Sequence, residues 1–149
     1  MKTFTTAICL LLCLGTVATQ AQQQKISPNP LFANYPSSIS ISADQLAVAM
    51  NSKEGQSISF NCSGKFIFTG TVISNLKKYD NLQTVMVKSS AFNNAIFQLT
   101  MVTEKKSSSF KGRIIHPGAT DGYELKFSEG SYGFQKFEMS RILETCDQH

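Results

Sequence analysis

Apolar and polar residues alternate with a period of two over much of the chain. In residues 57–62 every second side chain is apolar, and the side chains between them are serine or asparagine. Residues 96–103 show the same alternation, with Phe97 and Leu99 on one face. This period predicts half-buried strands that turn one face toward a core. Five further segments are rich in β-branched and aromatic residues, so the sequence predicts seven strands, at 56–62, 66–74, 82–88, 96–103, 110–115, 123–127 and 132–137.

Turn residues separate the predicted strands. Ser63-Gly64 has the spacing of a tight hairpin, and Glu129-Gly130 lies between the last two strands. Pro117-Gly118 indicates a loop, because proline fixes φ and glycine permits positive φ. The polar residues 75–81 predict a longer connection. Short connections of this kind join antiparallel neighbours, so we expect a meander.

Helical spacing is confined to two short segments. Ser42 followed by Gln45 has the spacing of a capping box, and residues 43–50 are good helix formers. We therefore expect a helix of about two turns before the first strand, held by packing rather than by its own propensity. Residues 138–146 carry apolar side chains at helical spacing and predict a short C-terminal helix.

The fold class that follows is mainly β: an antiparallel meander of six or seven strands, arranged as a barrel or sandwich, with a short N-terminal helix. The alternative is an α+β fold in which one curved antiparallel sheet packs on a helix. Gly70 and Gly112 lie inside strand patterns, where glycine marks a bulge or a close backbone approach and lets a sheet bend. With 149 residues, the chain has room for a single β-rich domain at 39–149.

The N-terminus has the organisation of a signal peptide. Lys2 supplies a positive charge, Ala7 to Val17 is uncharged and rich in leucine, and Thr19-Gln20-Ala21 offers small residues for cleavage. We predict cleavage after Ala21 and a secreted or periplasmic protein. The apolar run is shorter than the roughly 18 residues of a membrane helix, so no membrane span is expected. Residues 22–38 hold a glutamine tract and three prolines, which predicts an extended leader outside the core.

Two cysteines remain after this cleavage, Cys62 and Cys146. An even pair in an exported protein predicts a disulfide. The alternative is two unpaired buried thiols, because sequence does not determine the separation of the Cβ atoms.

Composition narrows the function classes. Hydrophobic residues make up 42% of the chain and charged residues 16%, which excludes a disordered chain. The sequence has 11 phenylalanines and no tryptophan, so we expect a packed, Phe-rich core. The net charge of +4 is spread along the sequence without a basic run, which argues against nucleic acid as a partner. No metal-ligand spacing and no phosphate-binding glycine pattern is present, so neither a metal nor another cofactor is expected.

The most suggestive chemistry surrounds the predicted loop at 116–122. Arg113, His116, Asp121, Tyr123 and Glu124 cluster there in sequence. An imidazole near a carboxylate is what acid–base catalysis uses, which makes His116 and Asp121 weak catalytic candidates. The simpler interpretation is a polar hairpin loop in which the aspartate caps its own turn.

The leading hypothesis is therefore an exported, non-enzymatic binding module. Loops on a rigid scaffold carry recognition in such modules, and we expect a binding face formed by 75–81 with 118–123, carried by Lys77, Lys78, Asp121 and Tyr123. Its partner would be an exported or envelope protein or a glycan. The alternatives are a small exported hydrolase or isomerase that uses His116 and Asp121, and an inhibitor of a secreted enzyme. The sequence leaves the oligomeric state open.

Overall fold

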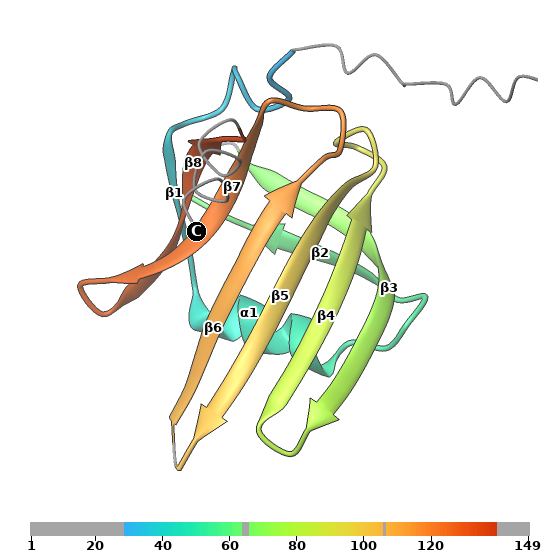
Figure 1. The fold of residues 1–149 in the computed structure, drawn as a ribbon, viewed down its shortest axis with the longest axis vertical. Coiled ribbons are helices and arrows are strands. Elements are labelled where there is room, and N and C mark those ends of the chain that lie inside the picture. The colour runs from blue at the N-terminus through green and yellow to red at the C-terminus, as the bar shows by residue number, and fades with distance from the viewer. Residues whose placement is uncertain (1–28, 64–65, 106, 140–149) are drawn as a thin grey trace, which may run out of the picture.

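A single antiparallel sheet and one helix make up the described part of the chain, residues 29–63, 66–105 and 107–139 of a computed structural model (Figure 1). The sheet has eight strands in the order β1-β8-β7-β6-β5-β4-β3-β2, and it curls into a half-barrel. The elements are β1 (Ser38–Ile41), α1 (Ala43–Asn51), β2 (Ser57–Asn61), β3 (Ile67–Tyr79), β4 (Leu82–Ser89), β5 (Ala95–Glu104), β6 (Ser107–Ile115), β7 (Asp121–Ser128) and β8 (Ser131–Glu138). The predicted antiparallel meander is confirmed, as a curled sheet and not as a two-layered sandwich.

Strand register places the apolar face of each strand on the concave side of the sheet. Val72, Val87, Phe97, Ile114 and Tyr123 are paired in succession across β3, β4, β5, β6 and β7. None of the five side chains is more than 1% exposed. The period of two in the sequence thus becomes one continuous buried row, because a strand directs alternate side chains to the same face.

Aromatic rings fill the space inside the curl. The rings of Phe68 and Phe92 stack with centroids 5.5 Å apart, and Phe66 lies 5.3 Å from Phe92. Phe97 meets Phe134 edge-on at 5.3 Å. The predicted Phe-rich core is therefore a cluster of aromatic rings in contact with one another. Such ring contacts stabilise a fold by more than the burial of their apolar area alone.

Two glycines permit close contact between strands. A Cβ atom on Gly70 would lie 2.6 Å from the backbone oxygen of Lys88, and one on Gly112 would lie 2.7 Å from the backbone oxygen of Gln98. Neither position has room for a side chain. The interpretation of these glycines as sites of close backbone approach is confirmed.

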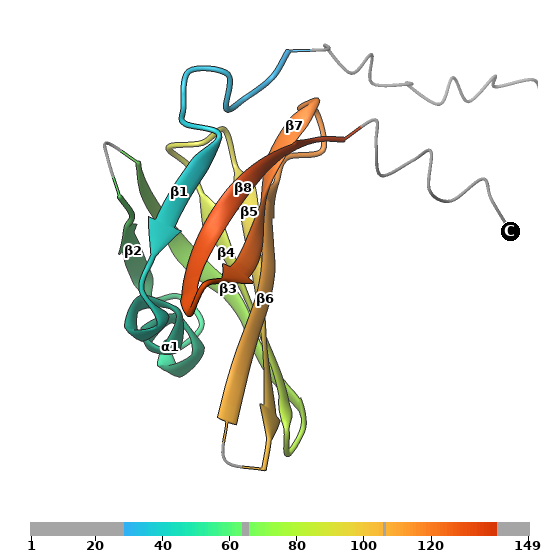
Figure 2. The ribbon, with the colours of Figure 1, turned by 90° about the vertical axis from the view of Figure 1, so that its left-hand side faces the viewer.

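The helix connects β1 to β2, the two edge strands of the sheet, and packs against β2, β4 and β5 (Figure 2). Ser42 caps it by accepting a hydrogen bond from the backbone N–H of Gln45, as the sequence predicts. The Gln45 side chain binds both the N–H and the carbonyl of Asn61 at the end of β2. Beside it, Ser40 of β1 accepts a backbone hydrogen bond from Ser63. The helix and these polar contacts thus hold the two edges of the curled sheet near each other.

One strand escapes sequence prediction, and another is longer than predicted. β1 is only four residues long and lies where we expected the leader to end. β3 continues to Tyr79, so the polar connection predicted at 75–81 is wrong. The reason lies in Asn75, whose amide donates to the carbonyls of Met50 and Ser52 at the end of α1. A polar strand residue here satisfies helix carbonyls that would otherwise lack partners.

The end of the predicted leader is part of the core. Phe32 is fully buried, and its ring lies 5.1 Å from that of Tyr123. The expectation that residues up to 38 stay outside the core is therefore wrong for this segment. Its prolines and lack of periodicity gave no indication of this packing, to which Leu31 and Tyr35 also contribute as partly buried side chains.

Some predictions concern residues that the structure does not describe. The signal peptide at 1–21 and Cys146 lie outside the described residues, so export and the disulfide stay predictions. Cys62, the other cysteine of the predicted pair, is buried. Of the predicted C-terminal helix, residues 140–146 also lie outside, and Glu138 ends β8 instead.

Replacing Phe32 by alanine should lower the free energy of unfolding by about 3–5 kcal/mol, because it leaves a cavity among the core rings. Phe127→Ala is the matched control, since that ring is 63% exposed and its removal should cost much less. Urea denaturation followed by tyrosine fluorescence measures both. Equal losses for the two variants would contradict the placement of Phe32 in the core.

Candidate functional site

The structure does not bring the four predicted binding residues together. Lys77 and Lys78 lie near the end of β3, and Asp121 and Tyr123 begin β7. These two positions are at opposite ends of the sheet (Figure 1). The predicted binding face includes a polar connection at residues 75–81. In the structure most of that segment is strand.

Lys77 and Lys78 occupy an ordinary solvated surface. Lys77 forms an exposed ion pair with Asp80 at 3.3 Å, with spacing i, i+3. The ammonium of Lys78 lies 5.6 Å from the centre of the Tyr79 ring. Exposed pairs of this kind contribute little to stability and do not form a site by themselves.

Asp121 and Tyr123 hold the anchor segment, which we define as residues 29–37. Asp121 is 4% exposed and accepts hydrogen bonds from the backbone N–H groups of Leu31, at 2.6 Å, and Phe32, at 2.9 Å. Tyr123 donates its hydroxyl to the carbonyl of Pro36 at 2.6 Å. Burial, with a smaller effect from the nearby Asp121, raises the pKa of Tyr123 to about 12. Both side chains therefore serve the fold rather than a surface.

Lys136 completes the attachment of the anchor segment. Its ammonium donates to the carbonyls of Phe32 and Tyr35, both at 2.6 Å. The same ammonium lies 6.0 Å from the centre of the Tyr123 ring. Side chains of β7 and β8 thus satisfy both N–H and C=O groups of an irregular segment that has few backbone partners.

His116 and Asp121 have separate partners and form no acid–base pair in the structure. Nδ1 of His116 accepts a hydrogen bond from the backbone N–H of Gly118 at 3.0 Å. Its Nε2 lies 3.4 Å from the side-chain nitrogen of Asn93. The imidazole organises the loop after β6, while the carboxylate faces the anchor segment. The simpler interpretation is correct in giving His116 a structural role in the loop, but it is wrong for Asp121, which is buried and binds the backbone of Leu31 and Phe32 in place of its own turn.

Replacing Asp121 by asparagine should lower the free energy of unfolding by about 1–3 kcal/mol, because an amide NH2 would face backbone N–H groups in place of a carboxylate oxygen. Asp80→Asn changes the same charge at an exposed position and should leave stability nearly unchanged. Thermal denaturation monitored by circular dichroism compares the two. Equal stability of the wild type and Asp121→Asn would show that the carboxylate does not hold the anchor segment.

A different feature, the separation of β6 from β7, forms the strongest candidate site. Pairing between these strands is confined to Arg113 with Glu124 and Ile114 with Tyr123. By contrast, β6 is paired with β5 along its whole length, and β7 is paired with β8 along its whole length. The two strands therefore diverge from this short contact, each with its other edge secured in the sheet.

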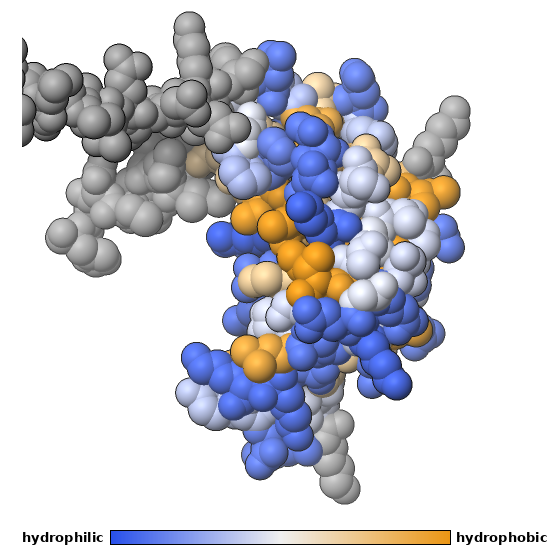
Figure 3. Space-filling view, turned by 90° about the vertical axis from the view of Figure 1, so that its right-hand side faces the viewer, coloured by the Kyte–Doolittle hydropathy of each residue, from blue (hydrophilic) through white to orange (hydrophobic). Residues whose placement is uncertain are grey.

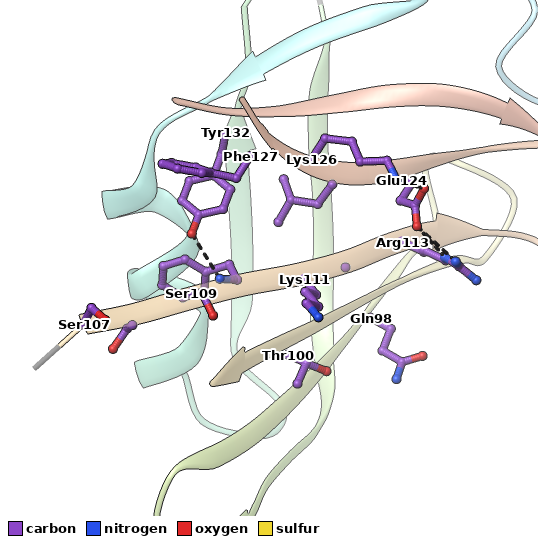
Figure 4. A pocket seen from close by; sticks show the side chains of 14 residues that line it. Gln98, Thr100, Ser107, Ser109, Lys111, Arg113, Glu124, Lys126, Phe127 and Tyr132 are labelled. Carbon is purple, nitrogen blue, oxygen red and sulfur yellow. Dashed lines mark hydrogen bonds and ion pairs between the residues drawn. The ribbon is translucent and has the colours of Figure 1, made fainter. Parts of the chain in front are cut away.

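The divergence leaves a groove of about 890 Å³ (Figure 4). This volume lies within the range of small-molecule and peptide sites, which runs from roughly 300 to 1,000 Å³. Its lining combines outward-facing polar side chains of β5, β6 and β7 with aromatic and aliphatic side chains from the inner face. The lining residues are Gln98, Thr100, Ser107, Ser108, Ser109, Phe110, Lys111, Gly112, Arg113, Glu124, Leu125, Lys126, Phe127 and Tyr132.

Charged side chains gather at the end of the groove where the strands meet. Arg113 lies 3.0 Å from one carboxylate oxygen of Glu124, and Lys126 lies 2.5 Å from the other. The hydrogen bond from Lys126, with that from Arg113, holds the pKa of Glu124 below its usual range, although partial burial opposes the shift. Lys111 forms no ion pair with another described residue. The rim of the groove is consequently positive, with three cations and one carboxylate that is already paired.

Aromatic side chains line the other end of the groove. The rings of Phe127 and Tyr132 lie 4.8 Å apart, and Phe110 lies 5.6 Å from Tyr132. Phe110 and Tyr132 are each 9% exposed, whereas Phe127 is 63% exposed. The hydroxyl of Tyr132 accepts a hydrogen bond from the backbone N–H of Phe110 at 3.1 Å, across the groove (Figure 4). A group of aromatic side chains and a positive rim thus occupy the two ends of one groove.

Two residues of this site were already candidates in the sequence, although not as part of a groove. Arg113 and Glu124 belong to the cluster singled out around the 116–122 loop, and the structure pairs them across β6 and β7. The groove itself has no motif, because it arises where strand pairing stops. The run Ser107–Ser109 lies between the predicted strands 96–103 and 110–115, and in the structure it begins β6 along one side of the groove.

Comparisons of the chain with protein-family models, with curated proteins and with solved structures find no match. In the ranges that the structure describes, no helix is long and apolar enough to cross a membrane. Among the same residues, no group of three or more histidine, cysteine, aspartate or glutamate side chains could hold a metal ion.

Proposed function

We propose that this chain is an exported, non-enzymatic binding module, and that its binding site is the groove between β6 and β7. The observation that carries the proposal is the termination of β6–β7 pairing after two residue pairs. A rigid sheet holds both walls of the groove, and ligand sites of this size bury most of a bound molecule. The signal peptide predicted at residues 1–21 supports export.

The proposal replaces the predicted binding face with a different set of residues. Lys111, Arg113 and Lys126 supply positive charge, and Phe127 supplies an exposed aromatic ring. Such rings, set among polar groups, are frequent energetic centres of protein interfaces. Asp121 and Tyr123 contribute indirectly, because they hold the anchor segment against β7 and β8, and β7 is one wall of the groove.

The positions of His116 and Asp121 favour the binding module over the enzymatic alternative. The two residues that it requires, His116 and Asp121, have separate structural partners. Nothing in the described part of the chain pairs a nucleophile with a base at the groove. Binding without catalysis therefore accounts for more of the observed contacts.

The test is affinity capture with residues 22–149 immobilised and exposed to the secreted and envelope fractions of the source. A double variant, Lys111→Ala with Phe127→Ala, should lower the retention of a specific partner by about tenfold, since interface anchors each contribute about 1 kcal/mol or more. The matched control is Lys88→Ala with Leu76→Ala, which removes an exposed lysine and an exposed apolar side chain of β4 and β3. Equal retention by both double variants would refute the groove as the site.

The control positions lie on a surface of different character. Ile67, Ile73, Leu76 and Tyr79 of β3 are exposed on the convex side of the sheet. Figure 3 shows a face on which apolar residues lie in small groups among polar ones. Scattered groups of this kind are normal for a soluble surface and do not mark a site.

A further inference from the structure

We infer that the groove takes an extended polypeptide segment as an added strand along β6, and that this segment alternates apolar and acidic residues. The inference rests on the proposed function and names the chemistry of its partner. It follows from three features of the groove: its backbone edge, the alternation of its lining, and its charge.

The first feature is an unpaired backbone edge. Beyond Arg113, β6 continues back to Ser107 without pairing to β7. Alternate residues of a strand direct their N–H and C=O groups to the same side. The N–H of Phe110 points into the groove, so the backbone groups of Ser108 and Gly112 share that edge. An unpaired strand edge is a template for another strand.

Tyr132 shows that this edge of β6 lacks a backbone hydrogen-bond acceptor. Its hydroxyl accepts the hydrogen bond of the Phe110 N–H at 3.1 Å. In a complete sheet, that N–H would be bound by the carbonyl of a neighbouring strand. A phenol oxygen therefore occupies the position of a backbone acceptor, and an incoming peptide carbonyl can replace it. The internal contact protects the N–H when no partner is bound and competes with a partner for it.

The second feature is the two-sided lining. A strand placed beside β6 would point alternate side chains toward the inner and outer faces of the sheet. On the inner side it would meet the aromatic group of Phe110, Phe127 and Tyr132. On the outer side it would meet Lys111 and Arg113. A segment with a period of two, apolar toward the inner side and polar toward the outer side, matches both faces at once.

The third feature is charge. Lys111, Arg113 and Lys126 face one carboxylate, that of Glu124, which is already bound by two of them. Acidic side chains on the outer face of the added strand would meet this positive rim, whereas basic side chains would be repelled. Charge complementarity of this kind selects partners and speeds association more than it raises affinity.

Fluorescence anisotropy with labelled eight-residue probes tests the inference on residues 22–149. The acetylated and amidated peptide (Val-Glu)4 should bind at least about tenfold more tightly than (Val-Lys)4, because like charges across an interface are costly. Two further copies of (Val-Glu)4 carry N-methyl groups either on the odd-numbered or on the even-numbered residues. The copy whose methyl groups face β6 should bind about tenfold more weakly, since it loses several backbone hydrogen bonds. Equal binding by the methylated copies would refute strand addition.

Two variants locate the peptide on the groove. Lys111→Glu should weaken binding of (Val-Glu)4 by about threefold to tenfold, while Lys88→Glu, with the same change in net charge on β4, should leave it unchanged. Both lysines are exposed, so neither variant is expected to disturb folding. Equal weakening by the two variants would mean that only net charge matters, and this would overturn the assignment to the groove.

Replacing Tyr132 by phenylalanine should tighten binding of (Val-Glu)4 by about threefold, because it removes the internal acceptor that competes for the Phe110 N–H. Thermal denaturation should show a folded but less stable protein, since the free variant leaves that N–H without its protein acceptor. Unchanged affinity would mean that Tyr132 acts only through the shape of its ring. A loss of affinity in the folded variant would contradict the replacement of its hydroxyl by a peptide carbonyl.

The two levels of proposal fail in different ways. If no probe binds while capture of a partner still depends on Lys111 and Phe127, strand addition is wrong and the groove remains a binding site of another kind, such as one for a glycan. If light scattering shows a dimer that Lys111→Glu abolishes and no probe binds, the occupant is a second copy of the chain and the inference is overturned. If neither probe binding nor capture depends on the groove, both proposals fall.

Discussion

Satisfying the buried backbone of the anchor segment is the constraint on which the arrangement of the sheet depends. Residues 29–37 bring Phe32 into the core, and this irregular segment pairs few of its own N–H and C=O groups there, such as the N–H of Tyr35 with the carbonyl of Phe32. Asp121, Tyr123 and Lys136 provide the missing partners. Because these side chains come from β7 and β8, the same contacts hold that pair of strands over the end of the core.

The groove is a by-product of this arrangement and of the tight curl of the sheet. β7 and β8 follow the anchor segment, while β6 stays paired with β5 along its length. The two strand pairs share only a short contact at Arg113 and Ile114. Since the concave side is filled by phenylalanine rings, the place left for a ligand is between the strands, where polar and apolar faces of the sheet are accessible together.

Much of the fold was predictable from sequence, whereas the site was not. The period of two, together with segments rich in β-branched and aromatic residues, located seven strands, and Ser42 with Gln45 located the helix start. Errors arose where tertiary contacts override local pattern: Asn75 is polar because it caps helix carbonyls, and Phe32 lies in a segment without periodicity. Asp121 and Tyr123 look like surface chemistry in sequence, because their partners lie about 90 residues away. The groove depends on where pairing ends, which no residue encodes by itself.

The long span of the anchor contacts has a consequence for the timing of folding. The segment that contributes Phe32 is synthesised before any strand, yet Lys136, which binds its carbonyls, follows 104 residues later. Contacts this distant in sequence make folding slow, because the chain must close a large loop before it gains their energy. The core therefore cannot be completed until β8, the last strand, has been synthesised.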